Sequence, residues 1–62
     1  MIWVTVTQTD DSRTIIHFNC VRVMKRSDDR EVTTLYFDQE HCVICKETPD
    51  QIISQVKATM KI

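Results

Sequence analysis

Hydrophobic and polar residues alternate with a period of two along most of the chain. Within the segment 2–8, isoleucine or valine at positions 2, 4 and 6 alternates with tryptophan or threonine at positions 3, 5 and 7. This alternation predicts a β-strand with one buried face. The same pattern and β-branched or aromatic content predict four further strands, over residues 14–19, 20–25, 31–38 and 42–47.

The period changes at Thr48, where a helix start is indicated. Thr48 suits the N-cap, Pro49 suits the first helical position, and Gln51 can complete a capping box. Helical spacing over residues 49–60 predicts an apolar stripe made of Ile52, Ile53, Val56 and Met60. The opposite, polar face is predicted to carry Gln51, Ser54, Gln55 and Lys57. Lys57 and Lys61 lie near the helix C-terminus, where the helix dipole favours a positive charge.

Short connections between these segments predict antiparallel hairpins in chain order. The expected fold is therefore α+β: a single domain, 1–62, with an antiparallel meander of about five short strands, forming a curled sheet or a small open barrel. One C-terminal helix is expected to pack on it. The most polar segment, 25–30, is predicted to be an exposed loop.

The 62 residues include no glycine. This excludes a phosphate-binding P-loop, a dinucleotide-binding fingerprint and the nucleophile elbow of hydrolases. Two-residue hairpin turns also depend on glycine. The turns are therefore expected to be longer loops that use aspartate, serine and asparagine, whose side chains bond their own backbone.

The small size of the chain favours association. For so short a domain, apolar burial and the conformational entropy of folding nearly cancel, so a partner or self-association would stabilise it. The net charge is −1, and no stretch of 18 apolar residues or basic, hydrophobic leader is present. We therefore expect a cytoplasmic protein with no membrane association.

Three cysteines, an odd number, indicate free thiols rather than a disulfide framework. Cys42 and Cys45 form a C-x-x-C pair, and His17 and Cys20 have the same spacing, so all four are candidate redox or zinc ligands. Both pairs fall in predicted strands, however, where residues i and i+3 point to opposite faces. We expect the ligands to diverge, and we expect no cofactor, no metal and no catalysis.

A second candidate site is basic. Arg22, Lys25, Arg26 and Arg30 are predicted to cluster around one loop, as in small β-domains that bind single-stranded nucleic acid. Asp28 and Asp29 interrupt this cluster. Nucleic-acid binding is therefore the alternative interpretation, and a solvated loop is the simpler one.

Trp3 is the candidate interaction residue. Alternation places it on the face of the first strand opposite Ile2, Val4 and Val6, and a tryptophan on a half-exposed face is typical of an interface. The other possibility is that the chain end or barrel closure covers the tryptophan.

Four segments together resemble a known family: the opening Ile2-x-Val4-Thr5, Asn19 before Val21 and Val23, the central Thr34-Leu35-Tyr36-Phe37, and Lys46-Glu47-Thr48-Pro49 before Ile52-Ile53. In this order they resemble the small flagellar FlbD-type, swarming-motility-associated family and similar short bacterial and phage proteins. The resemblance implies a cytoplasmic accessory protein without known catalytic residues. We predict a non-enzymatic interaction module with an unidentified protein partner, which can also self-associate.

Overall fold

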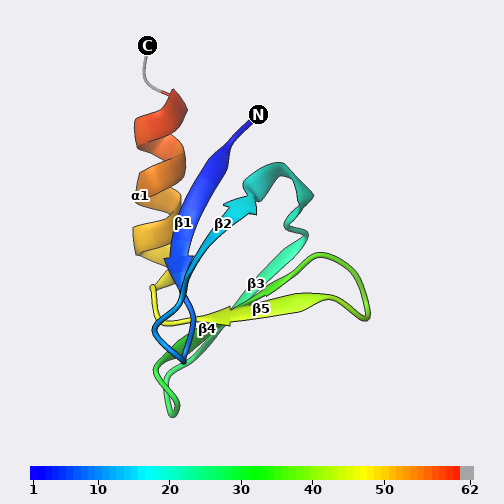
Figure 1. The fold of residues 1–62 in the computed structure, drawn as a ribbon, viewed down its shortest axis with the longest axis vertical. Helices are drawn as coiled ribbons and strands as arrows, with labels where there is room; N and C mark the ends of the chain where they lie inside the picture. Colours follow the sequence, from blue (N-terminus) through cyan, green and yellow to red (C-terminus); the bar gives the residue numbers. More distant parts are fainter. Residues whose placement is uncertain (61–62) are drawn as a thin grey trace.

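The computed structural model describes residues 1–60. Within this range the chain forms five β-strands, a short 3₁₀ helix and one α-helix (Figure 1). In chain order the elements are β1 (Trp3–Thr7), β2 (Arg13–His17), η1 (Phe18–Cys20), β3 (Val23–Ser27), β4 (Val32–Tyr36), β5 (Cys42–Cys45) and α1 (Pro49–Met60). The predicted α+β class, with antiparallel strands followed by one helix, is confirmed.

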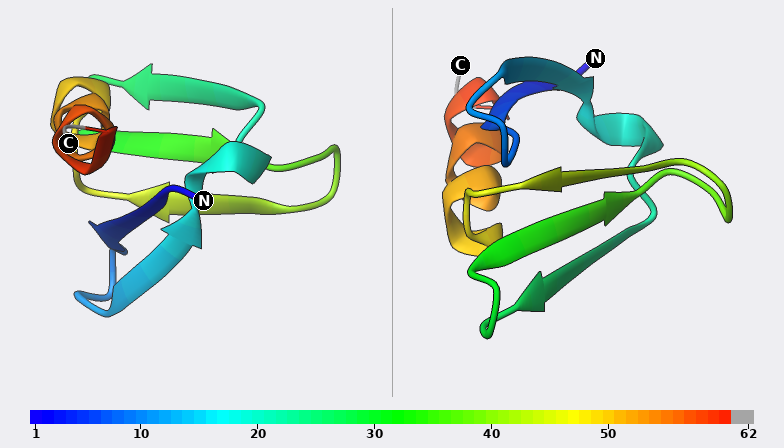
Figure 2. Two further views of the ribbon diagram at one scale, coloured as in Figure 1. Left: turned by 90° about the horizontal axis from the view of Figure 1, so that it is seen from above. Right: turned by 60° about the horizontal axis from the view of Figure 1, so that its bottom comes forward.

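The strands of residues 1–60 form two antiparallel sheets that do not close into a barrel (Figure 2). β1 pairs with β2, and β4 lies between β3 and β5. The sheets meet where β1 and β5 end: Gln8 and Cys45 form one antiparallel bridge, and the backbone N–H of Lys46 donates to the carbonyl of Thr7 at 2.8 Å. The chain passes from the first sheet to the second through η1.

The core contains the inward-facing side chains of both sheets and of α1. As the alternation predicts, Val4 and Val6 of β1 are buried and Ile2 is half-buried, while Trp3 faces the other way. α1 contacts β1 and β3. The buried apolar residues are Val4, Val6, Ile16, Leu35, Cys45, Ile52 and Val56.

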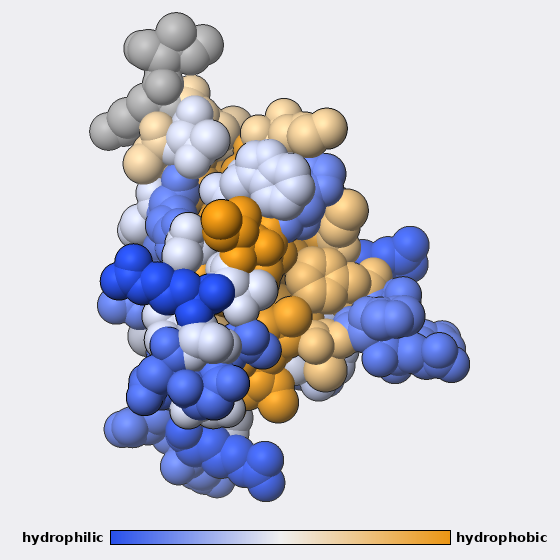
Figure 3. All heavy atoms as spheres, in the orientation of Figure 1, coloured by the Kyte–Doolittle hydropathy of each residue, from blue (hydrophilic) through white to orange (hydrophobic). Residues whose placement is uncertain are grey.

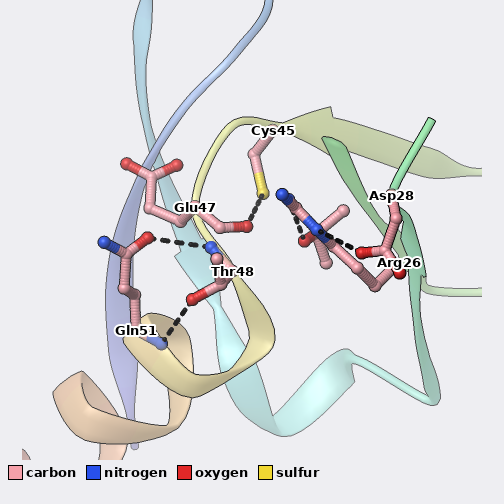
Figure 4. Close-up of polar contacts among 7 residues, drawn as sticks. Arg26, Asp28, Cys45, Glu47, Thr48 and Gln51 are labelled. Carbon is pink, nitrogen blue, oxygen red and sulfur yellow. Dashed lines mark hydrogen bonds and ion pairs between the residues drawn. The ribbon is translucent and has the colours of Figure 1, made fainter. Parts of the chain in front are cut away.

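α1 begins with the predicted capping box (Figure 4). The hydroxyl of Thr48 accepts a hydrogen bond from the backbone N–H of Gln51 at 3.1 Å, and the side-chain oxygen of Gln51 accepts one from the N–H of Thr48 at 2.8 Å. Ile52 and Val56 are buried, but Met60 is 64% exposed. The predicted stripe is therefore wrong at Met60, because the last turn of α1 extends beyond the start of β1 (Figure 1). Lys61 lies outside the described residues.

The segment between His17 and Ser27 differs from its prediction. The second strand ends at His17, Phe18–Cys20 form η1, and the third strand runs from Val23 to Ser27. The predicted exposed loop 25–30 is therefore wrong for residues 25–27 and confirmed for the exposed turn residues 28–30. Lys25 and Arg26 belong to β3, because their long aliphatic stems can lie along a sheet while their charged ends reach polar partners.

The turns are longer loops, as the lack of glycine predicts. The β1–β2 turn spans residues 8–12, the β3–β4 turn 28–31 and the β4–β5 turn 37–41. In the first, Asp10 accepts hydrogen bonds from the backbone N–H of Ser12 at 3.0 Å and from its hydroxyl at 2.6 Å. Asp11 and Glu31 take the positive φ values of 69° and 55° that glycine would otherwise supply.

Candidate functional site

The outer face of the β1–β2 hairpin carries exposed apolar side chains. Trp3 is 52% exposed and Ile15, on the neighbouring strand, is 68% exposed. Both lie on the face opposite the buried Val4 and Ile16. Figure 3 shows a band of hydrophobic side chains over this side of the molecule, with hydrophilic side chains on either side of it.

Trp3 stacks on His17, its cross-strand partner in the β1–β2 register. The ring centroids are 4.8 Å apart and the ring planes are inclined by 29°. The half-exposed indole is covered neither by the chain end of the described residues nor by a closed barrel. Trp3 is therefore a half-exposed residue of the outer face, with His17 stacked against one side of its ring.

The 3₁₀ turn η1 brings His17 and Cys20 together. The Sγ atom of Cys20 lies 3.3 Å from Nδ1 of His17, and Cys20 is exposed. The predicted divergence of this pair is wrong, because the chain leaves the strand at His17 and a single helical turn returns position i+3 to the same side. The other ring nitrogen of His17, Nε2, is buried and has no hydrogen-bond partner in the described residues.

Cys42 and Cys45 do diverge, as a strand requires. Cys42 is exposed, whereas Cys45 is fully buried in the core. Burial raises the pKa of the Cys45 thiol, and the negative charge of Glu47 raises it further. No three or more histidine, cysteine or acidic residues of the described chain come together as a metal site. His17, Cys20, Cys42 and Cys45 therefore do not form one ligand set.

The outer edge of β1 is filled by side chains. The amide of Gln55 on α1 accepts a hydrogen bond from the backbone N–H of Thr5 at 2.9 Å and donates one to the carbonyl of Thr5 at 2.8 Å. The carboxylate of Glu47 accepts a hydrogen bond from the backbone N–H of Thr7 at 2.7 Å. The carbonyl of Thr7 accepts a hydrogen bond from the backbone N–H of Lys46. Gln55, predicted on the solvent face of the helix, thus takes the place of a neighbouring strand.

The hydrogen bond to Thr7 affects the pKa of Glu47. Desolvation alone would raise its pKa, but hydrogen bonds from the backbone N–H groups of Thr7 and of Glu47 itself outweigh that effect and lower it. The ionised carboxylate is therefore the form that caps the edge of β1.

The outer edge of β2 is open. Since Thr5 and Thr7 direct their backbone groups away from β2, their register partners Ile15 and Arg13 direct theirs away from β1. No strand in residues 1–60 pairs with this edge. The exposed Ile15 side chain lies at its centre.

The four basic residues predicted to share a loop are divided between two surface cavities. Arg22 and Lys25 line a surface cavity of about 370 Å³, where the Lys25 ammonium lies 5.9 Å from the centroid of the Tyr36 ring. Arg26 and Arg30 line a second cavity, of about 560 Å³. The predicted single basic cluster is therefore wrong.

Arg26 is held by its neighbours (Figure 4). Its guanidinium donates to the hydroxyl of the buried Thr33 at 3.4 Å and lies 3.6 Å from the carboxylate of Asp28. Lys46, which lines the same cavity, pairs with Asp11. This cavity is therefore partly neutralised by its own ion pairs.

Sequence patterns did not identify Gln55 or the contact between His17 and Cys20. The strand alternation of residues 14–18 does place Ile15 on the same side as His17, so the second exposed apolar residue of the outer face could have been found. α1, at 12 residues with a polar face, is too short and too polar to cross a bilayer, and residues 1–60 contain no longer helix.

No family model, curated protein or solved structure matches this chain significantly.

Proposed function

We propose that the protein is a non-enzymatic interaction module that associates with a second copy of itself through β2. The observation that carries this proposal is the open edge of β2 beside the exposed Ile15 and Trp3. An unpaired strand edge is a template for another strand. β2 has no proline and no lysine to block such pairing, whereas the edge of β1 is filled by Gln55 and Glu47.

A two-fold axis at Ile15 suits the geometry of β2, which has five residues with Ile15 at the centre. Antiparallel pairing about this axis uses the outward backbone groups of Arg13, Ile15 and His17 in both copies, and it forms a closed dimer. Two two-stranded sheets would become one four-stranded sheet. This is favourable because a two-stranded sheet is marginal in water.

The exposed side chains add to the same surface. In the paired sheet the two Ile15 side chains lie next to each other on the outer face. His17 of one copy and Arg13 of the other lie at each end of this pair, and Trp3 lies next to His17. Burial of these side chains contributes the apolar area that backbone hydrogen bonds alone do not supply. We place this activity in the cytoplasm, in the accessory role that the resemblance to the flagellar FlbD-type family implies.

Sedimentation equilibrium from low micromolar to near-millimolar concentration tests the proposal. We expect a reversible dimer for the wild-type chain and a monomer for Ile15→Lys, in which two like charges would meet at the two-fold axis. Ile44→Lys is the matched control, because Ile44 is also an exposed strand residue, 42% exposed, on the other sheet. A wild-type chain that stays monomeric throughout, or a dimer unaffected by Ile15→Lys, would overturn the proposal.

Binding of single-stranded nucleic acid is the second candidate, and the cavity at Tyr36 favours it. Arg22 and Lys25 lie beside the Tyr36 ring, which combines phosphate-binding charge with a surface for base stacking. Asp38 in the same cavity opposes this charge. Gel-shift titration at low salt with mixed-sequence oligonucleotides should detect binding that Tyr36→Ala and Lys25→Glu weaken. No shift at low salt would exclude this candidate.

A further inference from the structure

Cys20 and His17 form a thiol–imidazole pair at the end of the hairpin. Cys20 is exposed, and its sulfur lies 3.3 Å from Nδ1 of His17. The imidazole is held in place by stacking on Trp3. A cysteine within hydrogen-bond distance of an imidazole has a partner that can stabilise negative charge on its sulfur.

The burial of Nε2 bears on which nitrogen of His17 carries the proton. A neutral imidazole carries its proton on one nitrogen only. Nε2 of His17 is buried and has no hydrogen-bond partner in the described residues, so a proton there would be an unsatisfied donor. Buried N–H groups without a partner are rarer than unfilled acceptors, so we take the reactive tautomer to be the one with the proton on Nδ1, directed at the sulfur of Cys20. This N–H group stabilises negative charge on the sulfur as the thiol reacts.

We propose that Cys20 is a thiol-modification site that reacts with small-molecule disulfides. The Cys20 thiol loses its proton to water, and the sulfur then attacks one sulfur of the disulfide. A new S–S bond forms on Cys20, the S–S bond of the reagent breaks, and the second half leaves as a thiolate that takes a proton from water. His17 contacts the reacting sulfur and donates a hydrogen bond to it. No other oxidant is required.

The chain contains its own controls for this reaction. Cys42 is equally a surface thiol, but no side chain of the described residues donates a hydrogen bond to it. Cys45 is buried in the core. Cys20 is thus exposed and hydrogen-bonded to an imidazole, Cys42 is exposed without such a partner, and Cys45 is inaccessible. The reacting Cys20 lies on η1, outside the edge of β2, although His17 is the last residue of that strand.

Reaction of the folded chain with oxidised glutathione at neutral pH, followed by peptide mass spectrometry, tests the proposal. We expect Cys20 to form the mixed disulfide about tenfold faster than Cys42, the ratio that one hydrogen bond to a charged sulfur supports. Cys45 should stay unmodified until the chain is unfolded. Equal rates at Cys20 and Cys42 in the wild-type chain would overturn the proposal without any substitution.

A variant separates the role of the imidazole from that of exposure. His17→Phe keeps an aromatic ring for stacking on Trp3 but removes Nδ1. The rate at Cys20 should then fall to that of Cys42, while the rate at Cys42 stays unchanged and serves as the internal measure of folding. An unchanged rate at Cys20 in this variant would show that His17 plays no part.

Discussion

The two outer edges of the β1–β2 hairpin have the same backbone chemistry but opposite surroundings. The edge of β1 is occupied by the amide of Gln55, the carboxylate of Glu47 and the N–H of Lys46. The edge of β2 has no neighbouring strand in residues 1–60. A side-chain amide can thus replace a strand, because it carries one donor and one acceptor at a spacing that matches a peptide group. Where no such group is supplied, the edge stays available for pairing.

Proline at successive positions of β2 provides the strongest test of this difference. Thr14→Pro removes an N–H that faces β1, since Thr14 pairs with Val6, and the loss of this ladder hydrogen bond should lower the free energy of unfolding by about 2–3 kcal/mol. Ile15→Pro removes an N–H of the open edge, so it should cost much less and yet abolish self-association. Urea denaturation and sedimentation measure the two effects. Equal destabilisation by both would contradict the assigned direction of the backbone groups.

Removal of the amide from the edge of β1 should have an intermediate effect. Gln55→Ala leaves the N–H and the carbonyl of Thr5 without their partner, and we expect a loss of about 1–2 kcal/mol in the free energy of unfolding. Ser54→Ala is the matched control, because Ser54 is an exposed neighbour on the same helix. Thermal and urea denaturation should separate the two variants. If Gln55→Ala also forms larger assemblies, the exposed edge of β1 has become a second pairing site.

Glu47 should make the smallest contribution, and one that depends on pH. Its pKa is lower in the folded chain than the ordinary value of 4.5, so its stabilising effect is complete above that value. The effect is lost as the pH falls from that value through the lowered folded pKa. Water screens this half-exposed group, so we expect less than about 1 kcal/mol. Glu47→Gln should flatten stability against pH in this acid range, and an unchanged slope would argue against the Thr7 contact.

Periodicity predicted the parts of the fold that depend on local sequence. The strand of residues 2–8, the capping box at Thr48 and the glycine-free turns follow from alternation, cap chemistry and side-chain hydrogen bonds. Each is governed by residues that are close in sequence. The opposite directions of Cys42 and Cys45 followed from the strand period alone.

The features that periodicity missed depend on where the chain leaves a regular element or on contacts distant in sequence. His17 and Cys20 meet only because the strand stops at His17, and no glycine or proline marks that point. The contact between Gln55 and Thr5 joins residues 50 positions apart. Lys25 and Arg26 have the composition of a loop, but pairing with β4 keeps them in a strand.

The positive φ angles of Asp11 and Glu31 have a consequence for the unfolded chain. A chain in which every residue has a Cβ atom samples fewer backbone conformations when unfolded, so it loses less entropy on folding than one with glycine at its turns. Within residues 1–60, the energetic cost of this stiffness falls on the two residues that adopt left-handed geometry. In so small a domain, backbone strain at two turns of the folded state is offset by the lower conformational entropy of the unfolded state.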